Sequence, residues 1–328
     1  DAIAIGNHDF DFGPDVLADF IEGYSETMPP YVSANLGFAD EPRLQALADA
    51  GRIVSSTVIT ERGVDIGIVG ATTPNINFIS SPRDVDVMED VAGIVQAEVD
   101  ALTASGVKII ILISHLQDID EDVALAAMLS DVDVMIAGGG DELLANPGNP
   151  LIPGEEGDVF GPYPIVATDA DGAEVPVVTT PGESKYLGEL WIGFDPDGKS
   201  TLWAGSPIRI EGAQDAGIFD AAVAPVIAAT ETHDATVIGT SEVALDGTRT
   251  SVRGVESNEG QLIADALRWQ AGQQADAFGV AVPDVAIQNG GGIRNNTVIE
   301  AGDITLLDTF DMVPFPNFVT VLEGIPRG

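Results

Sequence analysis

The stretch AIAIGNHDFDFG, residues 2–13, holds the two features from which the fold of this chain can be inferred. Its apolar half, Ala2–Ile5, is typical of a buried strand, which Gly6 ends. Its polar half crowds Asn7, His8, Asp9 and Asp11 into one turn, although the whole chain has only three histidines. In open α/β sheets, ligands bind beyond the carboxyl ends of strands. The stretch therefore predicts a strand whose exit carries a functional site.

The same arrangement recurs along the first half of the chain. Three further apolar runs predict buried strands: Val64–Val69, Val107–Ile113 and Val132–Ile136. Ser114 and His115 follow the second of these runs, and Gly138–Glu142 follows the third. Between the runs, helices are predicted over Asp120–Leu129 and where apolar residues recur at helical spacing, at Val91, Val95, Val99 and Leu102. Alternating strands and helices predict an α/β domain.

The remainder of the chain changes character twice. Residues 163–204 predict an antiparallel extension with strands over Ile165–Thr168, Val175–Thr180, Tyr186–Phe194 and Thr201–Ala204. The Ala-rich stretch Asp215–Thr230 predicts a linker helix, after which a second α/β unit begins near Thr236. In that unit we expect a helix over Glu259–Ala271, with Leu262, Ile263, Ala266 and Leu267 on one face, and a strand over Val285–Ile287. The predicted boundaries are residues 1–213, 214–235 and 236–328.

The composition excludes several classes of function. Of 328 residues, 53 are acidic and 13 basic, which gives a formal net charge of −40. Phosphate backbones and anionic membranes need basic surface, so we expect no nucleic-acid polymer as partner and no docking on membranes. The absence of cysteine excludes disulfides and thiolate metal sites, and no apolar run reaches membrane-spanning length. These features leave the oligomeric state open.

The polar cluster of residues 7–11 has two interpretations. In the functional one, Asn7 binds a metal through its amide oxygen, His8 faces the substrate, and Asp11 orients the imidazole. In the structural one, the cluster is an Asx-type turn before a helix. His115 by itself is typical of a hydrogen-bonded structural residue, and His233, in a polar linker, is expected to be exposed and uninvolved.

The second unit concentrates arginines around a glycine-rich loop. Arg249 and Arg253 flank a polar loop, and Arg294 follows the run that begins at Asn289. The planar guanidinium suits phosphate or carboxylate recognition, although surface ion pairs are the alternative. Phe315, which lies near Asn317, either stacks on a base or belongs to the core.

These pieces, in this order, resemble the 5'-nucleotidase family of two-domain metallophosphatases. The blocks that carry the resemblance are DAIAIGNHDFDFG (residues 1–13), YVSANL (31–36), VGATTP (69–74), ISH (113–115), SNEGQLIADALRW (257–269), QNGGGIRNN (288–296) and DMVPFPN (311–317). Asp9 stands where the family usually has Glu. The resemblance implies a four-layer α/β/β/α metallophosphatase domain followed by a second α/β domain that binds the nucleotide.

The resemblance also implies site residues. Two divalent metal ions would activate a water that attacks phosphorus, with Asn7, His115 and Asp141 among their ligands. His8 and Asp11 would form the catalytic dyad. In the second domain Arg249, Arg253 and Arg294 would hold phosphate or polar groups, Asn289 the base or sugar, and Phe315 would stack on the base, with Asn317 nearby. The substrate would be a nucleotide or another phosphomonoester, and the family implies a periplasmic or secreted location.

The sequence departs from the family pattern at the second metal-ligand segment. Gly139 stands in place of the first family histidine, and Asp141 in place of the second ligand, with Glu142 as a possible substitute. Such an oxygen-rich site favours Mn²⁺, Mg²⁺ or Ca²⁺ over Zn²⁺, or one metal position is weakened.

The family's Asp-x-His ligand pair, bridging Asp and second stacking aromatic would lie outside residues 1–328. We therefore expect these 328 residues alone to be inactive. The alternatives are a broader phosphatase, a cyclic-nucleotide phosphodiesterase, or a catalytically degenerate nucleotide-binding or surface protein.

Overall fold

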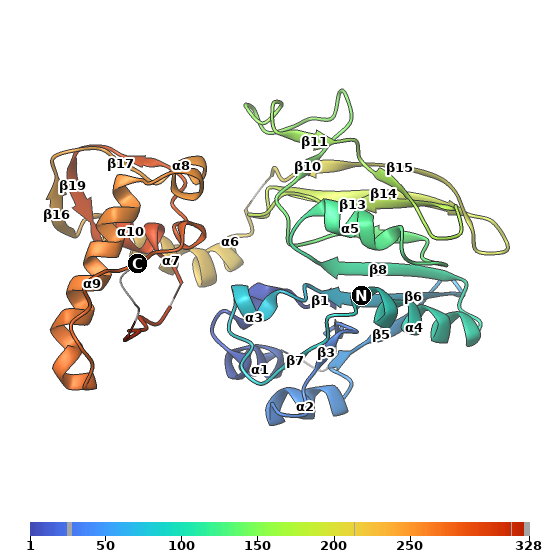
Figure 1. Ribbon diagram of the computed structural model, residues 1–328. Coiled ribbons are helices and arrows are strands. Elements are labelled where there is room, and N and C mark those ends of the chain that lie inside the picture. The colour runs from blue at the N-terminus through green and yellow to red at the C-terminus, as the bar shows by residue number, and fades with distance from the viewer. Residues whose placement is uncertain (25–27, 213, 316, 325–328) are drawn as a thin grey trace. The chain divides into compact units, whose positions relative to one another are not determined.

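Two units, each with its own apolar core, make up the chain. The computed structural model describes residues 1–24, 28–212, 214–315 and 317–324 (Figure 1). Unit 1 is Asp1–Gly212 and unit 2 is Ala213–Gly328. Each unit combines helices with sheets, so the predicted α/β class is confirmed.

Unit 1 contains most of the strands. They are β1 (Ile3–Ala4), β2 (Tyr31–Val32), β3 (Leu36–Gly37), β4 (Ile53–Val54), β5 (Ser56–Glu61), β6 (Val64–Thr72), β7 (Asp86–Val87), β8 (Ile109–His115), β9 (Val134–Ile136), β10 (Leu143–Leu144), β11 (Val159–Gly161), β12 (Ile165–Thr168), β13 (Glu174–Val178), β14 (Tyr186–Phe194) and β15 (Ser200–Arg209). The helices are η1 (Asn7–Phe10), α1 (Pro14–Gly23), α2 (Pro42–Asp49), α3 (Ile76–Ile79), α4 (Val91–Ala104) and α5 (Ile119–Ala126).

Two sheets bring the strand exits of unit 1 together. The larger has the order β12-β13-β9-β8-β6-β5, and its inner strands β13, β9, β8 and β6 run parallel. The smaller is the parallel sheet β1-β2-β4. Thr72, at the end of β6, donates a hydrogen bond from Oγ1 to the carbonyl oxygen of Ile5, 2.7 Å away. The end of β1 therefore lies beside the ends of β6 and β8.

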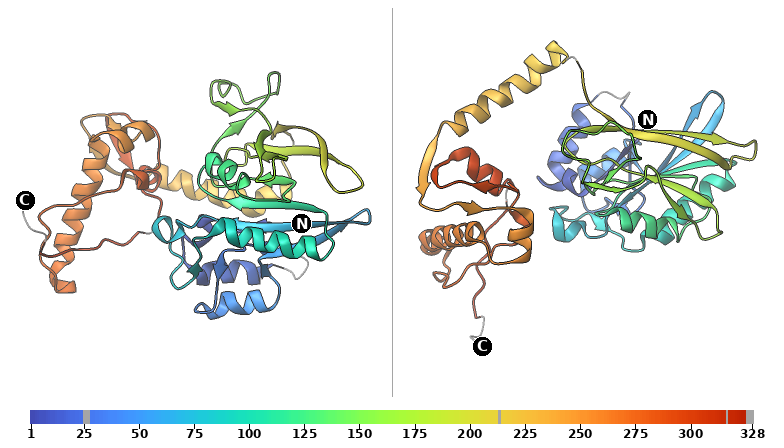
Figure 2. Two further views of the ribbon diagram at one scale, coloured as in Figure 1. Left: turned by 45° about the vertical axis from the view of Figure 1, so that its right-hand side comes forward. Right: turned by 90° about the horizontal axis from the view of Figure 1, so that it is seen from above.

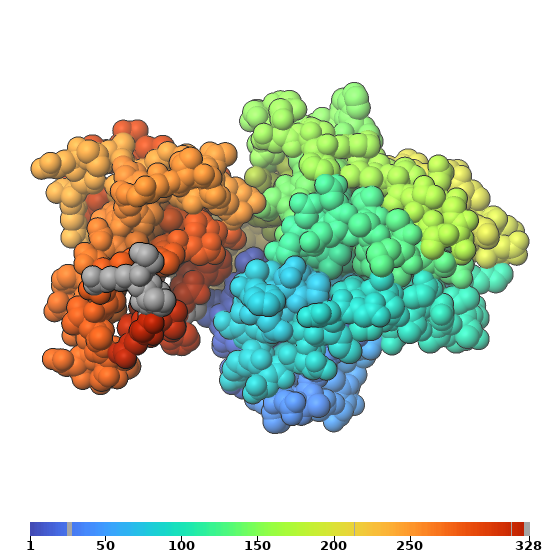
Figure 3. Space-filling model, in the orientation of Figure 1, coloured from blue at the N-terminus to red at the C-terminus, as the bar shows by residue number. Residues whose placement is uncertain are grey.

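The core of unit 1 follows the predicted apolar pattern. Val91, Val95, Val99 and Leu102 of α4 are all buried, and they belong to the same apolar cluster as Val69, Ile110 and Leu112 of the large sheet. Burying each of these side chains contributes about 1.5–3 kcal/mol. In the space-filling view, unit 1 is closely packed from the blue helix α2 to the yellow-green ribbon β14–β15 (Figure 3).

The antiparallel extension forms, with one strand longer than expected. The predicted strand Thr201–Ala204 is wrong in length, because β15 continues to Arg209 and pairs with β14 over its whole length. Leu187 lies opposite Ile208 and Trp191 opposite Ala204, so the pairing continues well past the predicted end. The turns expected at Asp171-Gly172 and Asp197-Gly198 are present, and both glycines have φ near +87°.

Unit 2 begins with a helical segment. Figure 2 shows α6 (Ala216–Ile218), η2 (Phe219–Val223) and α7 (Ala224–Asp234) as one continuous rod. The other elements are β16 (Val237–Ser241), β17 (Leu245–Asp246), α8 (Arg249–Gly254), α9 (Asn258–Phe278), η3 (Gly290–Gly292), β18 (Val298–Ile299), β19 (Gly302–Thr305) and α10 (Leu306–Met312). Strand β16 pairs with β19, and β17 with β18. None of the helices that the structure describes is long and apolar enough to cross a membrane.

Three predictions for unit 2 are wrong. No strand forms over Val285–Ile287, where Val285 is 74% and Ile287 90% exposed, because no described strand pairs with this segment. On α9 only Ile263 of the predicted apolar face is buried, while Leu262 and Ala266 are exposed. His233 is half-buried and stacks on Phe310, with ring centroids 5.3 Å apart.

Asp122 of α5 is a buried acid that ties this helix to β8. Its side chain is 1% exposed and accepts a hydrogen bond from Ser114 Oγ at 2.5 Å, while its second oxygen is buried without a partner. Burial raises the pKa of Asp122 to about 7, and nearby acidic side chains add to the effect. The folded protein therefore holds the neutral acid more readily than the unfolded chain does.

We predict that stability falls as the pH rises from about 4 to about 7, because only the unfolded chain readily releases the Asp122 proton in this range. Asp122→Asn should weaken this dependence, to which the raised pKa values of Asp133 and Glu259 also contribute, and should stabilise the protein at pH 8 by up to about 4 kcal/mol at about 1.4 kcal/mol per pKa unit. Urea denaturation at pH 5 and pH 8 measures both effects. Asp100→Asn, at an exposed position of α4, is the control and should not alter the pH dependence.

Candidate active site

The turn after β1 is closed by Asp9. Residues Asn7–Phe10 form a 3-10 helix, and Asp9 Oδ2 accepts a hydrogen bond from the backbone N–H of Gly6 at 2.7 Å. Burial raises the pKa of Asp9, and the backbone hydrogen bond opposes that rise. Asp9, to which the sequence assigned no task beyond the turn, is thus the residue that closes it.

Within this turn, His8 and Asp11 are paired. His8 Nδ1 lies 2.7 Å from Asp11 Oδ2, and the His8 side chain is 56% exposed while that of Asp11 is 14% exposed. The other oxygen of Asp11 accepts a hydrogen bond from Ser80 Oγ at 2.9 Å. Since both carboxyl oxygens are engaged, the Asp11 side chain has a fixed orientation. Its contact with Nδ1 orients the exposed imidazole of His8.

Asn7 and His115 meet beside this pair. His115 Nε2, at the end of β8, lies 2.9 Å from Asn7 Oδ1, and Gln117 Nε2 donates to the same oxygen at 3.0 Å. Asn7 is 4% exposed. Burial, and to a smaller degree His8, lower the pKa of His115. Both effects favour the neutral imidazole, which is the form that binds metal ions.

The His115 ring lies against glycine backbone. A Cβ on Gly6 would stand 2.5 Å from the ring, and one on Gly138 would stand 3.6 Å from Nδ1. Gly139 has a φ of +94°, and a Cβ there would stand 3.0 Å from the ring and far inside contact distance of the Leu116 carbonyl oxygen. Side chains at Gly6 or Gly139 are therefore incompatible with this placement of His115.

Asp141 and Glu142 follow the glycine run after β9. Its Oδ1 faces Gly182, where a Cβ would stand 3.2 Å away, and Glu142 folds back over Gly140. Glu142 Oε2 is buried without a hydrogen-bond partner, and burial raises the pKa of this acid. Among the described residues, no three His, Cys, Asp or Glu side chains are grouped so that they could hold a metal ion. The role of Asp141 as a ligand stays a prediction.

The residues predicted to bind the nucleotide gather in unit 2. Helix α8 carries Arg249 and Arg253 and packs on η3, since a Cβ on Gly290 would stand 3.4 Å from Arg253 Cα. Asn289 caps η3, and its Oδ1 accepts from Gly291 N at 3.2 Å. The Arg294 guanidinium lies 5.2 Å from the centroid of the Phe315 ring, a cation–π distance. This places Arg294 over an aromatic face.

Asn296 and Asn317 complete this region. Asn296 Oδ1 accepts from the backbone N–H of Arg249 at 2.9 Å, which ties the loop after η3 to the start of α8. The backbone N–H of Asn317 donates to the carbonyl oxygen of Phe315 at 2.8 Å. These contacts connect α8, η3 and the loop after η3 to one another, and the binding role of the six predicted residues stays a prediction.

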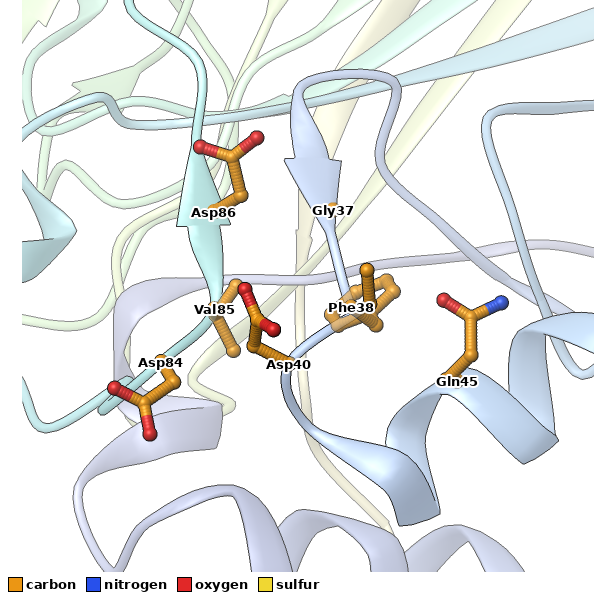
Figure 4. A pocket seen from close by; sticks show the side chains of 8 residues that line it. Gly37, Phe38, Asp40, Gln45, Asp84, Val85 and Asp86 are labelled. Carbon is orange, nitrogen blue, oxygen red and sulfur yellow. The ribbon is translucent and has the colours of Figure 1, made fainter.

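Unit 1 also has a pocket that none of the predicted site residues lines. Its volume is about 750 Å³, and it lies beside β3 and β7 (Figure 4). Asp40, Asp84 and Asp86 make its lining acidic, together with Gly37, Phe38, Ala39, Gln45 and Val85. The residues that the sequence predicts for the active site of unit 1 therefore lie elsewhere, at the strand exits.

Ser80, Gln117 and Asn296 are contact residues that the sequence did not reveal. Ser80 is 69 residues from Asp11, and Gln117 is 110 residues from Asn7. No spacing within the sequence signals such contacts. Asn296 lay inside a block of the family resemblance and had no assigned role.

Comparisons with known proteins agree with this fold. A 5'-nucleotidase precursor from Thermus thermophilus superposes with a TM-score of 0.76 at 34% identity, over 96% of this chain and 58% of that protein. The fold is thus that of the two-domain 5'-nucleotidase and metallophosphatase type. Residues 237–323 match the family model described as 5'-nucleotidase, C-terminal domain.

Relatives with curated names also include 5'-nucleotidases. A 5'-nucleotidase of Bos taurus is 33% identical over 90% of this chain and 50% of its own length. The snake venom 5'-nucleotidase of Naja atra is 31% identical over 98% of this chain and 60% of its own length. The chain belongs to the 5'-nucleotidase family, and it spans about half the length of the curated relatives it matches.

We predict that Gly139→Ala destabilises unit 1 by more than the roughly 1 kcal/mol expected when a side chain is forced into positive φ without a clash. The extra cost arises because its Cβ meets the Leu116 carbonyl oxygen and the His115 ring. Gly172→Ala is the matched control, since Gly172 has a φ of +86° and open space around it. Gly139→His, which restores the family residue, should cost at least as much as Gly139→Ala. Equal thermal midpoints for Gly139→Ala and Gly172→Ala would contradict the clash.

Proposed function

We propose that this chain supplies the His–Asp pair and the nucleotide-binding unit of a metal-dependent phosphomonoesterase that hydrolyses nucleotides. The observation that carries the proposal is the 2.7 Å contact between His8 and Asp11 beside the Asn7–His115 pair. The named 5'-nucleotidase relatives support a nucleotide as substrate. The snake venom relative supports a secreted or periplasmic location.

His8 has the geometry of a proton donor to a phosphate ester. Hydrolysis joins a water oxygen to phosphorus, breaks the bond to the leaving oxygen and delivers a proton to that oxygen. Asp11 engages Nδ1, so Nε2 is the nitrogen that would face the phosphoryl or leaving oxygen. The Asp11 carboxylate fixes the orientation of the ring, so a proton on Nε2 would be held at a defined position for transfer.

Asn7 and His115 fit a divalent cation in part. An amide oxygen and a neutral imidazole nitrogen 2.9 Å apart are suitable donors, and the glycine backbone around His115 holds the ring in place. A divalent ion bound there would supply Lewis acidity and a more acidic water. Two ligands are fewer than a catalytic centre requires, so no step of the reaction is derived through the metal.

Unit 2 has the groups needed to recognise the nucleoside end. Arg294 lies over Phe315 and donates from Nη1 to the carbonyl oxygen of Gly291 at 3.3 Å. Arg249 and Arg253 lie on α8, which packs on η3, and the planar guanidinium group is suited to bind phosphate. Phe315 is half-buried, which leaves part of its ring available for stacking on a base.

The test uses a chimera in which this chain replaces the matching segment of the Thermus thermophilus protein. We predict that the chimera hydrolyses AMP with added Mn²⁺, and that His8→Ala lowers kcat/KM about 10²- to 10⁴-fold, the usual contribution of a general acid or base. Asp11→Asn combined with His8→Ala should cost little more than His8→Ala alone, because the pair acts as a unit.

His233→Ala is the control, because His233 stacks on Phe310 and is not part of the proposed site. Unchanged hydrolysis after His8→Ala would overturn the proposal.

If the chimera does not fold, AMP is titrated into the chain itself and followed by amide NMR. Shifts at Arg294 and Asn289 that Phe315→Leu abolishes would support the proposal, and their absence would oppose it. Parallel assays with a cyclic nucleotide and a simple aryl phosphate separate the phosphodiesterase and broad phosphatase alternatives.

A catalytically degenerate nucleotide-binding protein is the second candidate function. Gly139 and the lack of a three-residue metal group among the described residues favour it. The discriminating measurement is Mn²⁺ binding to the chimera by elemental analysis after gel filtration. We predict bound metal, and its loss in the double variant Asn7→Leu, His115→Leu. AMP binding without bound metal or hydrolysis would favour the degenerate alternative.

A further inference from the structure

Glu259 and Asn295 form a buried polar pair in unit 2 that the proposed reaction does not use. Glu259, in the first turn of α9, is 0% exposed, and its Oε2 accepts a hydrogen bond from Asn295 Nδ2 at 3.2 Å. The remaining oxygens of the pair, Glu259 Oε1 and Asn295 Oδ1, are buried without hydrogen-bond partners. A buried acceptor without a donor is unfavourable because it has lost its hydrogen bonds to water. The pair therefore lacks a donor.

The two unpartnered oxygens lie close together. Asn295 Oδ1 and Glu259 Oε1 approach the point where a Cβ of residue 247 would stand, to within 2.3 and 2.5 Å, so Gly247 is needed to make room for them. Rotating the amide by 180° exchanges Oδ1 and Nδ2 and still leaves one oxygen facing an oxygen. The contact between the two oxygens becomes a hydrogen bond only if one of them carries a hydrogen.

The surroundings favour that hydrogen being on Glu259. Burial raises the pKa of Glu259, and the charged groups that act on it, Asp246 of β17 and Asp308 of α10, are acidic and raise it further. The hydrogen bond from Asn295 opposes the rise. A neutral carboxyl group has one donor and one acceptor, which match the acceptor and donor of an amide.

We propose that Glu259 is a neutral carboxylic acid in the folded protein and forms a doubly hydrogen-bonded acid–amide pair with Asn295. Asn295 Nδ2 donates to Glu259 Oε2, and Glu259 Oε1–H donates to Asn295 Oδ1. One proton thereby satisfies both unpartnered oxygens.

The pair joins the first turn of α9 to the loop that carries the predicted substrate contacts. Arg294, which lies over Phe315, precedes Asn295, and Asn296, which accepts from the Arg249 backbone, follows it. Glu259 is therefore a positioning residue that acts through Asn295. This role for substrate binding rests on the proposed function, whereas the acid–amide pair does not.

Glu259→Gln tests the pair, because the glutamine amide supplies the donor at every pH. The wild-type contribution is fully present below the unfolded pKa of glutamate and is lost as the pH rises toward the raised folded pKa. We expect Glu259→Gln to match the wild type at pH 5, and its urea midpoint to exceed that of the wild type increasingly between pH 5 and pH 8. Glu256→Gln, at an exposed position three residues earlier, should show no such trend. A midpoint for Glu259→Gln as low at pH 8 as that of Glu259→Leu would overturn the proposal.

Infrared difference spectra give a readout that does not depend on stability. At pH 6, the wild type minus Glu259→Gln should contain the C=O band of a protonated carboxyl group, and a carboxylate band alone would overturn the pair. AMP titrations then test positioning: Glu259→Leu should weaken the shifts at Arg294, and Glu259→Gln should preserve them. If AMP binds neither wild type nor variants while the infrared band is present, the proposed function fails and the acid–amide pair stands.

Discussion

The contact of the His115 ring with glycine backbone is the constraint on which the candidate active site depends. His115 is the last residue of β8, and its ring lies against Gly6 after β1 and against Gly138 and Gly139 after β9. Three strand exits are thereby brought within contact distance of one imidazole. Because the ring is held this closely, Nε2 meets Asn7 Oδ1 at 2.9 Å, and the turn that carries Asn7 also presents His8. The same contact requires a glycine at position 139 in this chain, although the resemblance implies a histidine there.

Charge is distributed differently in the two units. In unit 1, Arg43 pairs with Asp19 at 2.6 Å and Glu22 at 2.7 Å, and Arg83 pairs with Asp15 at 2.9 Å. Exposed pairs of this kind contribute little to stability, because solvent screens them, and mainly offset the acidic surface. In unit 2, Arg294 lies on an aromatic ring, and Arg249 and Arg253 share the short helix α8 beside the glycine-rich loop. Two of the buried acids, Asp122 and Glu259, have raised pKa values because burial and neighbouring carboxylates disfavour their charged forms.

Much of the fold was predictable, and the failures have a common cause. The strands at residues 64–69, 107–113 and 132–136 and the buried face of α4 follow from local apolar periodicity, which acts over a few residues. The segment Val285–Ile287 has the same local pattern and forms no strand, since a strand also needs a partner to receive its hydrogen bonds. His233 was expected to be exposed, yet Phe310, distant in sequence, covers one face of its ring.

The sequence by itself determined the α/β class, the polar strand exits and the family, because apolar periodicity and ordered motif blocks are local properties of the chain. The His8–Asp11 pair, three residues apart on one turn, also belongs to this local part. Only the tertiary structure decided which side chains complete the site: Ser80 on Asp11, Gln117 and His115 on Asn7, and Asn295 on Glu259. These partners are 36 to 110 residues apart, so their contacts depend on sheet register and helix packing, which no local pattern specifies.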